Sequence, residues 1–401
     1  MEQGYLVCKN GKSEGVFREL PEKYHSYPCK DYRDSLIIPG MVDLHVHAPQ
    51  YLYRGTKMDL ELLDWLEQNT FPEEAKFQDI RYAKKAYRLF VDDLKKGFTT
   101  RACIFATLHR PATLALMKLL EDSGLHCYVG LVNMNRNSPE YLCEQSVEQA
   151  IRDTRKWIEA ANKNFRNVKP VITPRFVPSC SDRLLLELGK LQREFHLPVQ
   201  SHLSENQSEI AWVHELSPKA RFYGDAYDMF GLFGGDHKAI MAHCVYSSEE
   251  EIALMEKNRV FIAHCPESNL NLASGIAPVR SYLEGNLNVG LGTDVAGGTS
   301  LSMLKAIQHT IQVSKLYWRL VDSSKKPLTV EEAFYLATRG GGAFFGKVGS
   351  FQKGYEFDAL VVDVKKNTSI KNFTLRDQLE RLIYLPEEHR ILEKYTAGKK
   401  I

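Results

Sequence analysis

The stretch MVDLHVH, residues 41–47, decides the fold class, because it is a short apolar run that ends in histidine. Runs of similar length recur along the chain, and stretches with a helical pattern separate them. Such runs are typical of strands that are buried on both faces of a parallel sheet. We therefore predict strands over residues 41–47, 98–105, 127–133, 170–176, 198–203, 239–244, 260–265 and 288–294.

The stretches between these runs have the period of amphipathic helices. Residues 81–96 place apolar side chains on one face, and Gly97 follows as a helix stop. Ser248, with Glu251 three residues later, predicts a capping box at the start of another helix. Strands that alternate with helices predict an α/β protein. Because polar residues follow the strand ends around the whole set, a (β/α)8 barrel of the TIM type is favoured over a doubly wound open sheet.

Two segments lie outside the predicted metal-dependent barrel, which we place at residues 39–349. Residues 1–38 contain the strand-like pieces YLVCKN and SLIIPG, and residues 350–401 contain GYEFDALVVDV. Neither segment is long enough to bury a core of its own. We therefore expect the two segments to pair in one small β-rich domain.

The composition excludes several classes of protein. Hydrophobic residues make up 44% and charged residues 25% of the 401 residues, and the net charge is +2, as in ordinary globular proteins. This charge gives no long-range attraction to nucleic acid or to a membrane surface, and no apolar run is long enough to span a bilayer. The eight cysteines form no C-x-x-C pair, and the first residues do not resemble a signal peptide. We expect reduced thiols in a cytoplasmic protein, without a disulfide framework or a cysteine-based zinc site.

The histidines of the opening stretch are candidate metal ligands. His45 and His47 point the same way along their strand, so both can approach one metal ion. The pair alone is weak evidence, because a histidine in a strand is commonly a structural residue. The hypothesis gains support because His202, His243 and Asp294 end later strands. Imidazoles and a carboxylate, with a position left open for water, describe a catalytic metal site, and these donors favour zinc, with iron or manganese as substitutes.

Other polar residues at the strand ends have two interpretations each. Glu205, three residues beyond His202, is either a general acid–base group or an acidic residue in the first turn of the next helix. Asp294 is either a metal ligand and base or a helix cap. Arg175 and Phe176 end the fourth run. Arg175 either binds a carbonyl or carboxylate oxygen or forms a salt bridge, and Phe176 either stacks on a planar ring or is a core aromatic.

Arg175 stands where barrels with two metal ions commonly carry a bridging lysine, so a single ion is favoured. His264 and Asn269 follow the seventh run. A single-metal site leaves no ligand role for His264, which we expect to support the ligands or the core. Histidines away from the predicted carboxyl ends of strands are interpreted as structural or surface residues, namely His109, His126, His196, His214, His237 and His309.

With these residues in view, the chain resembles the amidohydrolase superfamily, from Ile38 to about Asp358. The resemblance rests on PGMVDLHVH, SHLSE, MAHC and GLGTD, which occur in this order at successive strand ends. Within the superfamily the chain is similar to the guanine deaminases, through HVHAPQY, TPRF followed by SCS, QSHLSENQSEI, AHCPESNL and GLGTDVAGG. HAPQY and TPRF are the more discriminating pieces. The segment before the first barrel strand is shorter than is usual in that family, which suggests a reduced β domain.

The resemblance implies zinc-dependent hydrolytic deamination of guanine to xanthine and ammonia. It implies one zinc ion per subunit, held by His45, His47, His202 and Asp294. It implies that the catalytic residues are Glu205, His243 and Asp294. It implies that the purine contacts His47, Gln50, Arg175, Phe176, His202, Glu205 and Asp294. It also implies a homodimer, with no nucleic acid or membrane as partner.

Two alternatives to this function stay open at the level of sequence. A deaminase or chlorohydrolase on the same scaffold acts on a pterin, cytosine, an adenosine derivative or a triazine, and only Gln50, Arg175 and Phe176 would distinguish it. A non-catalytic scaffold protein would have lost metal ligands, whereas every expected ligand is present in this sequence.

Overall fold

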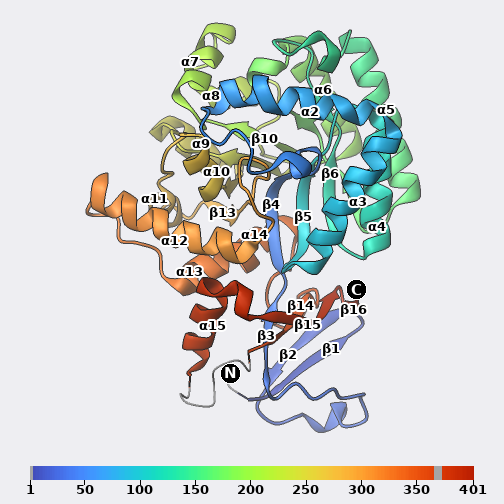
Figure 1. Ribbon diagram of the computed structural model, residues 1–401, viewed down its shortest axis with the longest axis vertical. Coiled ribbons are helices and arrows are strands. Elements are labelled where there is room, and N and C mark those ends of the chain that lie inside the picture. The colour runs from blue at the N-terminus through green and yellow to red at the C-terminus, as the bar shows by residue number, and fades with distance from the viewer. Residues whose placement is uncertain (1–2, 365–372) are drawn as a thin grey trace.

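Eight parallel strands form a closed barrel at the centre of the computed structural model, which describes residues 3–364 and 373–401 (Figure 1). Their order is β10-β11-β12-β13-β4-β5-β6-β8, and a parallel bridge between Ile172 and Val199 closes the barrel. The predicted fold class is therefore confirmed. The strands are β4 (Met41–His47), β5 (Thr99–Phe105), β6 (His126–Gly130), β8 (Val168–Pro170), β10 (Val199–Leu203), β11 (Ala239–His243), β12 (Phe261–His264) and β13 (Asn288–Leu291).

The fourth predicted strand, residues 170–176, differs from the expectation. It is split into β8, which ends at Pro170, and β9 (Thr173–Pro174), which pairs with β7 (Val132–Asn133) outside the main sheet. A proline has no N–H to give to a ladder, so a strand that contains two prolines cannot pair along its whole length. The break leaves Arg175, the next residue, in the wall of the pocket at the barrel mouth.

Helices cover the outside of the barrel (Figure 1). Within the described residues, none is both long and apolar enough to cross a bilayer. The helices are α1 (Leu62–Trp65), α2 (Phe71–Ala75), α3 (Ile80–Lys96), α4 (Arg110–Ser123), α5 (Val147–Asn164), α6 (Asp182–Phe195), α7 (Gln207–Leu216), α8 (Tyr223–Asp228), α9 (Glu249–Asn258), α10 (Pro266–Asn271), α11 (Val279–Glu284), α12 (Met303–Leu320), α13 (Val330–Tyr335), α14 (Gly341–Phe345) and α15 (Leu375–Tyr384).

The predicted helix signals are mostly present in the structure. Helix α3 ends at Gly97, as expected, and buries the apolar face that its sequence presents. At α9, the Ser248 side chain accepts the Glu251 N–H at 3.2 Å, so the predicted N-cap is correct. The reciprocal half of the capping box is wrong, because the Glu251 carboxylate turns inward and accepts from Ser204 Oγ at 2.8 Å and from the Gly224 N–H at 2.6 Å.

The two ends of the chain pair in a small β-rich unit below the barrel in Figure 1, as the sequence predicts. A four-stranded sheet has the order β16-β15-β14-β3, so the C-terminal segment adds directly to the strand that leads into β4. A hairpin of two further strands joins it through a bridge between Lys12 and Glu356. The strands are β1 (Tyr5–Lys9), β2 (Lys12–Phe17), β3 (Ser35–Pro39), β14 (Ala359–Asp363), β15 (Arg390–Thr396) and β16 (Lys399–Lys400).

Buried charges attach this unit to the barrel. Asp358, just before β14, accepts from Arg101 of β5 at 2.6 Å (Nε) and 3.2 Å (Nη2), and from the Ala397 N–H at 2.7 Å. Lys394 of β15 donates to the carbonyls of Lys95 and Gly97 at 2.9 Å, where α3 ends. The lysine thereby satisfies carbonyl groups that the helix leaves without an intrahelical partner.

We expect Asp358→Ala to destabilise the protein strongly. Arg101 would lose both hydrogen bonds to its carboxylate partner and keep only the longer contact with Glu356, 3.9 Å away, and breaking a buried pair from one side costs about 3–5 kcal/mol. Asp122→Ala is the matched control, because Asp122 pairs with Lys118 on the surface, where a pair contributes about 0–1 kcal/mol. Denaturant unfolding of the two variants measures the difference. Equal free energies of unfolding would contradict the role given to Asp358.

Candidate active site

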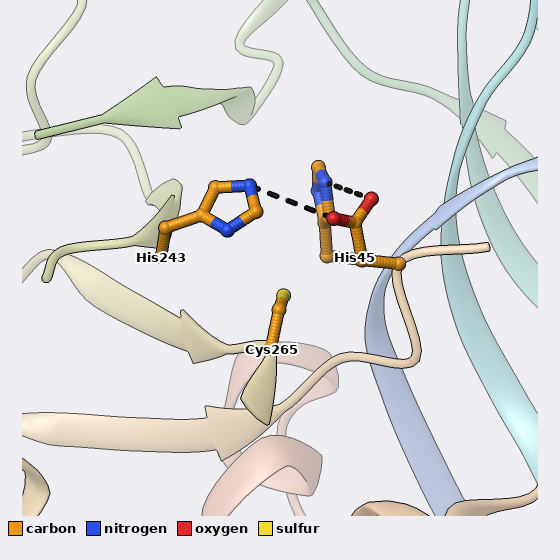
Figure 2. A group of neighbouring side chains, drawn as sticks. His45, His243 and Cys265 are labelled. Atoms are coloured by element: carbon orange, nitrogen blue, oxygen red, sulfur yellow. Dashed lines mark ion pairs between the residues drawn. The ribbon is translucent and has the colours of Figure 1, made fainter. Parts of the chain in front are cut away.

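Polar side chains from four parts of the barrel meet at the carboxyl ends of its strands. His45 and His47 come from β4, His202 from β10 and His243 from β11, and Asp294 follows β13. Figure 2 shows a carboxylate that pairs with the rings of both His45 and His243. The structure therefore brings together every residue that the sequence predicted as a ligand.

The ring nitrogens of three histidines converge on one point. His47 Nε2 lies 3.2 Å from His45 Nε2 and 3.2 Å from His202 Nε2. Asp294 Oδ1 lies 3.2 Å from His45 Nε2 and 3.4 Å from His47 Nε2. Ligands about 2.1 Å from a tetrahedral zinc ion are separated by about 3.4 Å, so this spacing is what a bound cation requires.

The hydrogen bonds and charges of the cluster also fit a cation. His202 Nδ1 lies 2.6 Å from the Arg175 carbonyl, which accepts only from a protonated nitrogen, so the lone pair of this ring is on Nε2. Burial lowers the pKa of His45. It lowers the pKa of His47 and of His202 well below the usual value, so the three rings stay neutral. Burial by itself would raise the pKa of Asp294, but the His45 ring keeps it below its usual range. Neutral imidazoles and an ionised carboxylate are the forms that bind metal.

Cys265 is a residue of this region that the sequence reasoning missed. Its sulfur lies in a group with His45, His243 and Asp294 whose candidate ligand atoms are all within 4.8 Å of one another, and Figure 2 shows it below the carboxylate. A second such group contains His45, His47 and His202. Burial raises the pKa of the Cys265 thiol well above its usual value, and its Sγ is 3.4 Å from the Ala263 carbonyl. The imidazole nitrogens of the histidine group are 3.2 Å apart, whereas the sulfur donates to a backbone carbonyl, so the histidine group is the better metal site.

Glu205 and His243 form a second polar pair beside the ligands. Glu205 Oε2 lies 3.3 Å from His243 Nε2, and Glu205 Oε1 accepts from Ser274 Oγ at 2.9 Å. On its other side, His243 Nδ1 is 2.8 Å from Asn269 Oδ1, an oxygen that can only accept. Burial raises the pKa of Glu205 to about 7, and the neighbouring His243 opposes the shift. A carboxyl group with such a pKa can both give and take a proton near neutral pH.

The alternative roles at a helix start are wrong for both acidic residues. Helix α7 begins at Gln207 with Asn206 as its N-cap, so Glu205 lies before the first turn, and Ser302, not Asp294, caps α12. The backbones of His243 and Asp294 have φ values of 73° and 45°, in the left-handed region that residues with a Cβ rarely adopt. Such a conformation at the end of a strand is typical of functional sites, because the surrounding fold has to hold it.

A pocket of about 430 Å³, counting the part open to solvent, lies above the cluster. Part of its wall comes from α1 and the next turn, η3 (Leu66–Thr70), which cross the carboxyl end of the barrel (Figure 1). The predicted substrate contacts Gln50, Arg175 and Phe176 all line it. Its lining residues are His47, Gln50, Leu62, Trp65, Leu66, Arg175, Phe176, His202, Glu205, Glu209, His243, Leu272, Asp294 and Gly297.

For Arg175, the structure confirms the ion pair, one of the two interpretations of the sequence, and its grip on an oxygen stays a prediction. It lines the pocket, and it also forms a buried ion pair with Glu74 of α2, with Nη1 2.6 Å from Oε2. Glu74 was missed because it belongs to an acidic helix and is 101 residues from this partner in the sequence. Only the segment that crosses the barrel mouth brings the two together.

The remaining histidines lie outside the cluster. His264 is buried, and neither of its ring nitrogens has a hydrogen-bond partner among the described residues. It belongs to neither group of candidate ligands, in agreement with the expectation that it is not a ligand. The histidines interpreted as structural or surface residues also belong to neither group of candidate ligands, namely His109, His126, His196, His214, His237 and His309.

Comparison with known proteins agrees with this geometry. A model of the amidohydrolase family matches residues 36–385. The chain belongs to the amidohydrolase family. This amidohydrolase is 40% identical to the guanine deaminase of Dictyostelium discoideum, over 92% of this chain and 83% of the relative, and 39% identical to that of Homo sapiens, over 96% and 87%. It also superposes on the crystal structure of the guanine deaminase from C. acetobutylicum with bound guanine in the active site, with a TM-score of 0.96, 49% identity, and 99% and 94% of the two chains covered.

The two groups of candidate ligands make different predictions for metal content. We expect His202→Ala to lose most of the bound metal, because it removes a neutral imidazole from the histidine group. Cys265→Ser should keep the metal content of the unchanged protein, because the thiol stays protonated. Elemental analysis of the purified variants measures both. Loss of metal from Cys265→Ser alone would show that the sulfur is a ligand.

Proposed function

We propose that this amidohydrolase converts guanine and water to xanthine and ammonia. The observation that carries the proposal is that the Glu205–His243 pair and the candidate ligands line the same pocket as Gln50, Arg175 and Phe176. The relatives named above are guanine deaminases, and one of them was crystallised with guanine in its active site.

The proposed metal is zinc, because the converging donors are imidazole nitrogens and a carboxylate oxygen. Zinc held by His45, His47, His202 and Asp294 would lower the pKa of a water molecule, so that it attacks at neutral pH.

The protein's own side chains would move the protons. Asp294 Oδ1 faces the ligand histidines, which leaves Oδ2, 3.7 Å from His243 Nε2, to take a proton from the attacking water. Glu205 gives its proton to N3 of the purine, which makes the adjacent C2 more electrophilic. Once Glu205 has given up its proton, its carboxylate raises the pKa of His243 against the effect of burial, and His243 donates from Nε2 to the attacking oxygen.

The second half of the reaction returns these protons. When the C2–N bond breaks, the proton on Asp294 passes to the departing amino group, which leaves as ammonia. The new hydroxyl group on C2 gives its proton to Glu205 and becomes the carbonyl of xanthine. Both carboxyl groups thereby return to their starting states, so one water molecule is consumed for each ammonia released.

The pocket wall would hold the ring. Phe176 is 6% exposed, lines the pocket, and forms an edge-to-face pair with Trp212 at a centroid distance of 6.3 Å, which holds its ring in place. Gln50 and Arg175 carry N–H groups that suit the acceptor atoms of a purine edge. The alternative function is a deaminase or chlorohydrolase on the same scaffold that acts on a pterin, cytosine, an adenosine derivative or a triazine. The remote alternative is a scaffold protein without catalytic activity.

We further propose that the enzyme works as a cytoplasmic homodimer. All eight cysteines are free, as expected for a reducing compartment. Sedimentation analysis of the purified protein tests the dimer.

We expect the purified, zinc-loaded protein to release ammonia from guanine, and Glu205→Gln to lower kcat by about 10²–10⁴-fold, because it removes the proton donor. Glu215→Gln is the matched control, because this glutamate is on α7, the helix that follows Glu205, and is exposed. A screen of guanine, adenine, cytosine and a pterin measures the preference. Turnover of another ring but not of guanine would refute the proposal.

We expect kcat/KM to fall as the pH rises above about 7. Glu205 has to be protonated to give a proton to N3, and burial raises its pKa to about 7, so the active fraction decreases tenfold for each further pH unit. A pH profile of initial rates, with the metal content checked at each pH, measures this. A rate that is constant from about pH 6 to 9 would contradict the role of Glu205 as acid.

A further inference from the structure

Glu74 of α2 lies behind the pocket wall and contacts two residues that form it. Its Oε1 accepts from Gln50 Nε2 at 2.9 Å and from Arg175 Nη2 at 3.3 Å, and its Oε2 accepts from Arg175 Nη1 at 2.6 Å. Gln50 and Arg175 line the pocket, whereas Glu74 does not. Glu74 is 2% exposed, so its contacts are made out of water, where a hydrogen bond to a charged group is strong.

These contacts fix which way the Gln50 amide faces. Its Nε2 gives one N–H to Glu74, and its Oε1 accepts the Ala296 N–H at 3.1 Å. A rotation of the amide by 180° would place its oxygen against the Glu74 carboxylate and its NH2 group against the Ala296 N–H. Both contacts would then be repulsive, so Gln50 Oε1 keeps accepting from the Ala296 N–H. The second N–H of the Gln50 amide remains available to a ligand.

Arg175 is held in the same manner. Two of its nitrogens point at the Glu74 carboxylate in a forked arrangement, and its guanidinium carbon lies 5.2 Å from the centre of the Phe71 ring. A guanidinium has five N–H groups and no acceptor, so those not used by Glu74 can only donate. Together, Gln50 and Arg175 offer the pocket N–H donors, while the amide oxygen is already used.

We propose that Glu74 is a positioning residue that makes this wall a surface of donors and so selects 2-aminopurines with an oxygen at C6. The inference rests on the proposed function and deepens it. A C6 carbonyl accepts from such a wall, whereas a C6 amino group would bring N–H groups against N–H groups. Leaving buried donors unpaired in this way is costly, and a site built to pair with one group can reject an analogue that lacks it.

The effect should appear mainly in binding. Glu74 does not line the pocket, and it has no contact with Glu205, His243 or Asp294 among the described residues. An interaction with a part of the substrate that does not react is the same in the ground state and in the transition state. Its loss raises KM with little change in kcat.

The test compares guanine with 2,6-diaminopurine, which has the same C2 amino group but an amino group at C6. Glu74→Gln removes the charge that orients Arg175 and lets either glutamine offer its oxygen to the pocket. We expect KM for guanine to rise about 10- to 100-fold, with kcat changing less than about threefold. We also expect the ratio of the inhibition constant of 2,6-diaminopurine to KM for guanine to fall at least about tenfold.

Glu73→Gln is the matched control, because Glu73 is next to Glu74 on α2 but pairs with Lys76, 2.6 Å away, at the surface. This variant should keep the KM for guanine, and the ratio of the inhibition constant of 2,6-diaminopurine to that KM, of the unchanged protein. Should Glu74→Gln not fold, Glu74→Asp, which keeps the charge but shortens the side chain, is measured in the same way, and its ratio should fall below that of the unchanged protein. A ratio unchanged in Glu74→Gln, or in Glu74→Asp where only that variant folds, would overturn the inference. Failure of the unchanged protein to deaminate guanine would instead refute the proposed function.

Discussion

The carboxylate of Asp43 holds together the two chain segments on which the site depends. It accepts from the His45 N–H at 3.2 Å, from the Thr293 N–H at 3.1 Å and from Thr293 Oγ1 at 2.5 Å. Strands β4 and β13 pair in the sheet only through Leu291 and Asp43, and two backbone hydrogen bonds continue the link, from the Asp294 N–H to the His45 carbonyl at 2.8 Å and from the His47 N–H to the Val295 carbonyl at 3.1 Å. Asp43 therefore links β4, with its two candidate ligands, to the loop that carries Asp294. Burial raises the pKa of Asp43 to about 7, against the hydrogen bonds from Thr293, so this link depends on each donor that it receives.

One physical cause, the burial of the barrel mouth, sets the protonation of the whole site. Burial penalises the charged form of every group, so it lowers the pKa of His47 and raises that of Glu205. The same environment thus supplies a neutral ligand and an acid that holds its proton near neutral pH. Asp294 and His243 are exceptions, because the His45 ring and its neighbours keep Asp294 ionised in spite of burial, and the Glu205 carboxylate raises the pKa of His243. The chemistry of the pocket therefore depends on which groups face one another.

Sequence patterns predicted the parts of the site that follow from strand periodicity. His45 and His47 are two residues apart on β4, and His202 lies on β10, so all three point to the mouth wherever a parallel barrel forms. The prediction failed where local chemistry competes with the pattern. Pro170 and Pro174 interrupt the fourth strand, and the inward turn of Glu251 breaks the expected capping box.

The sequence by itself determined the barrel, the candidate ligands and the residues that resemble a purine site, because these depend on residue type and on short, regular spacing. Only the tertiary structure decided that Glu74 stands behind Gln50 and Arg175, and that Cys265 lies beside the ligands. Contacts between residues 24 or 101 positions apart leave no periodic trace in a chain. They arise when a segment folds across the barrel mouth or when two neighbouring strands end at the same level, so the packing of the whole barrel fixes them.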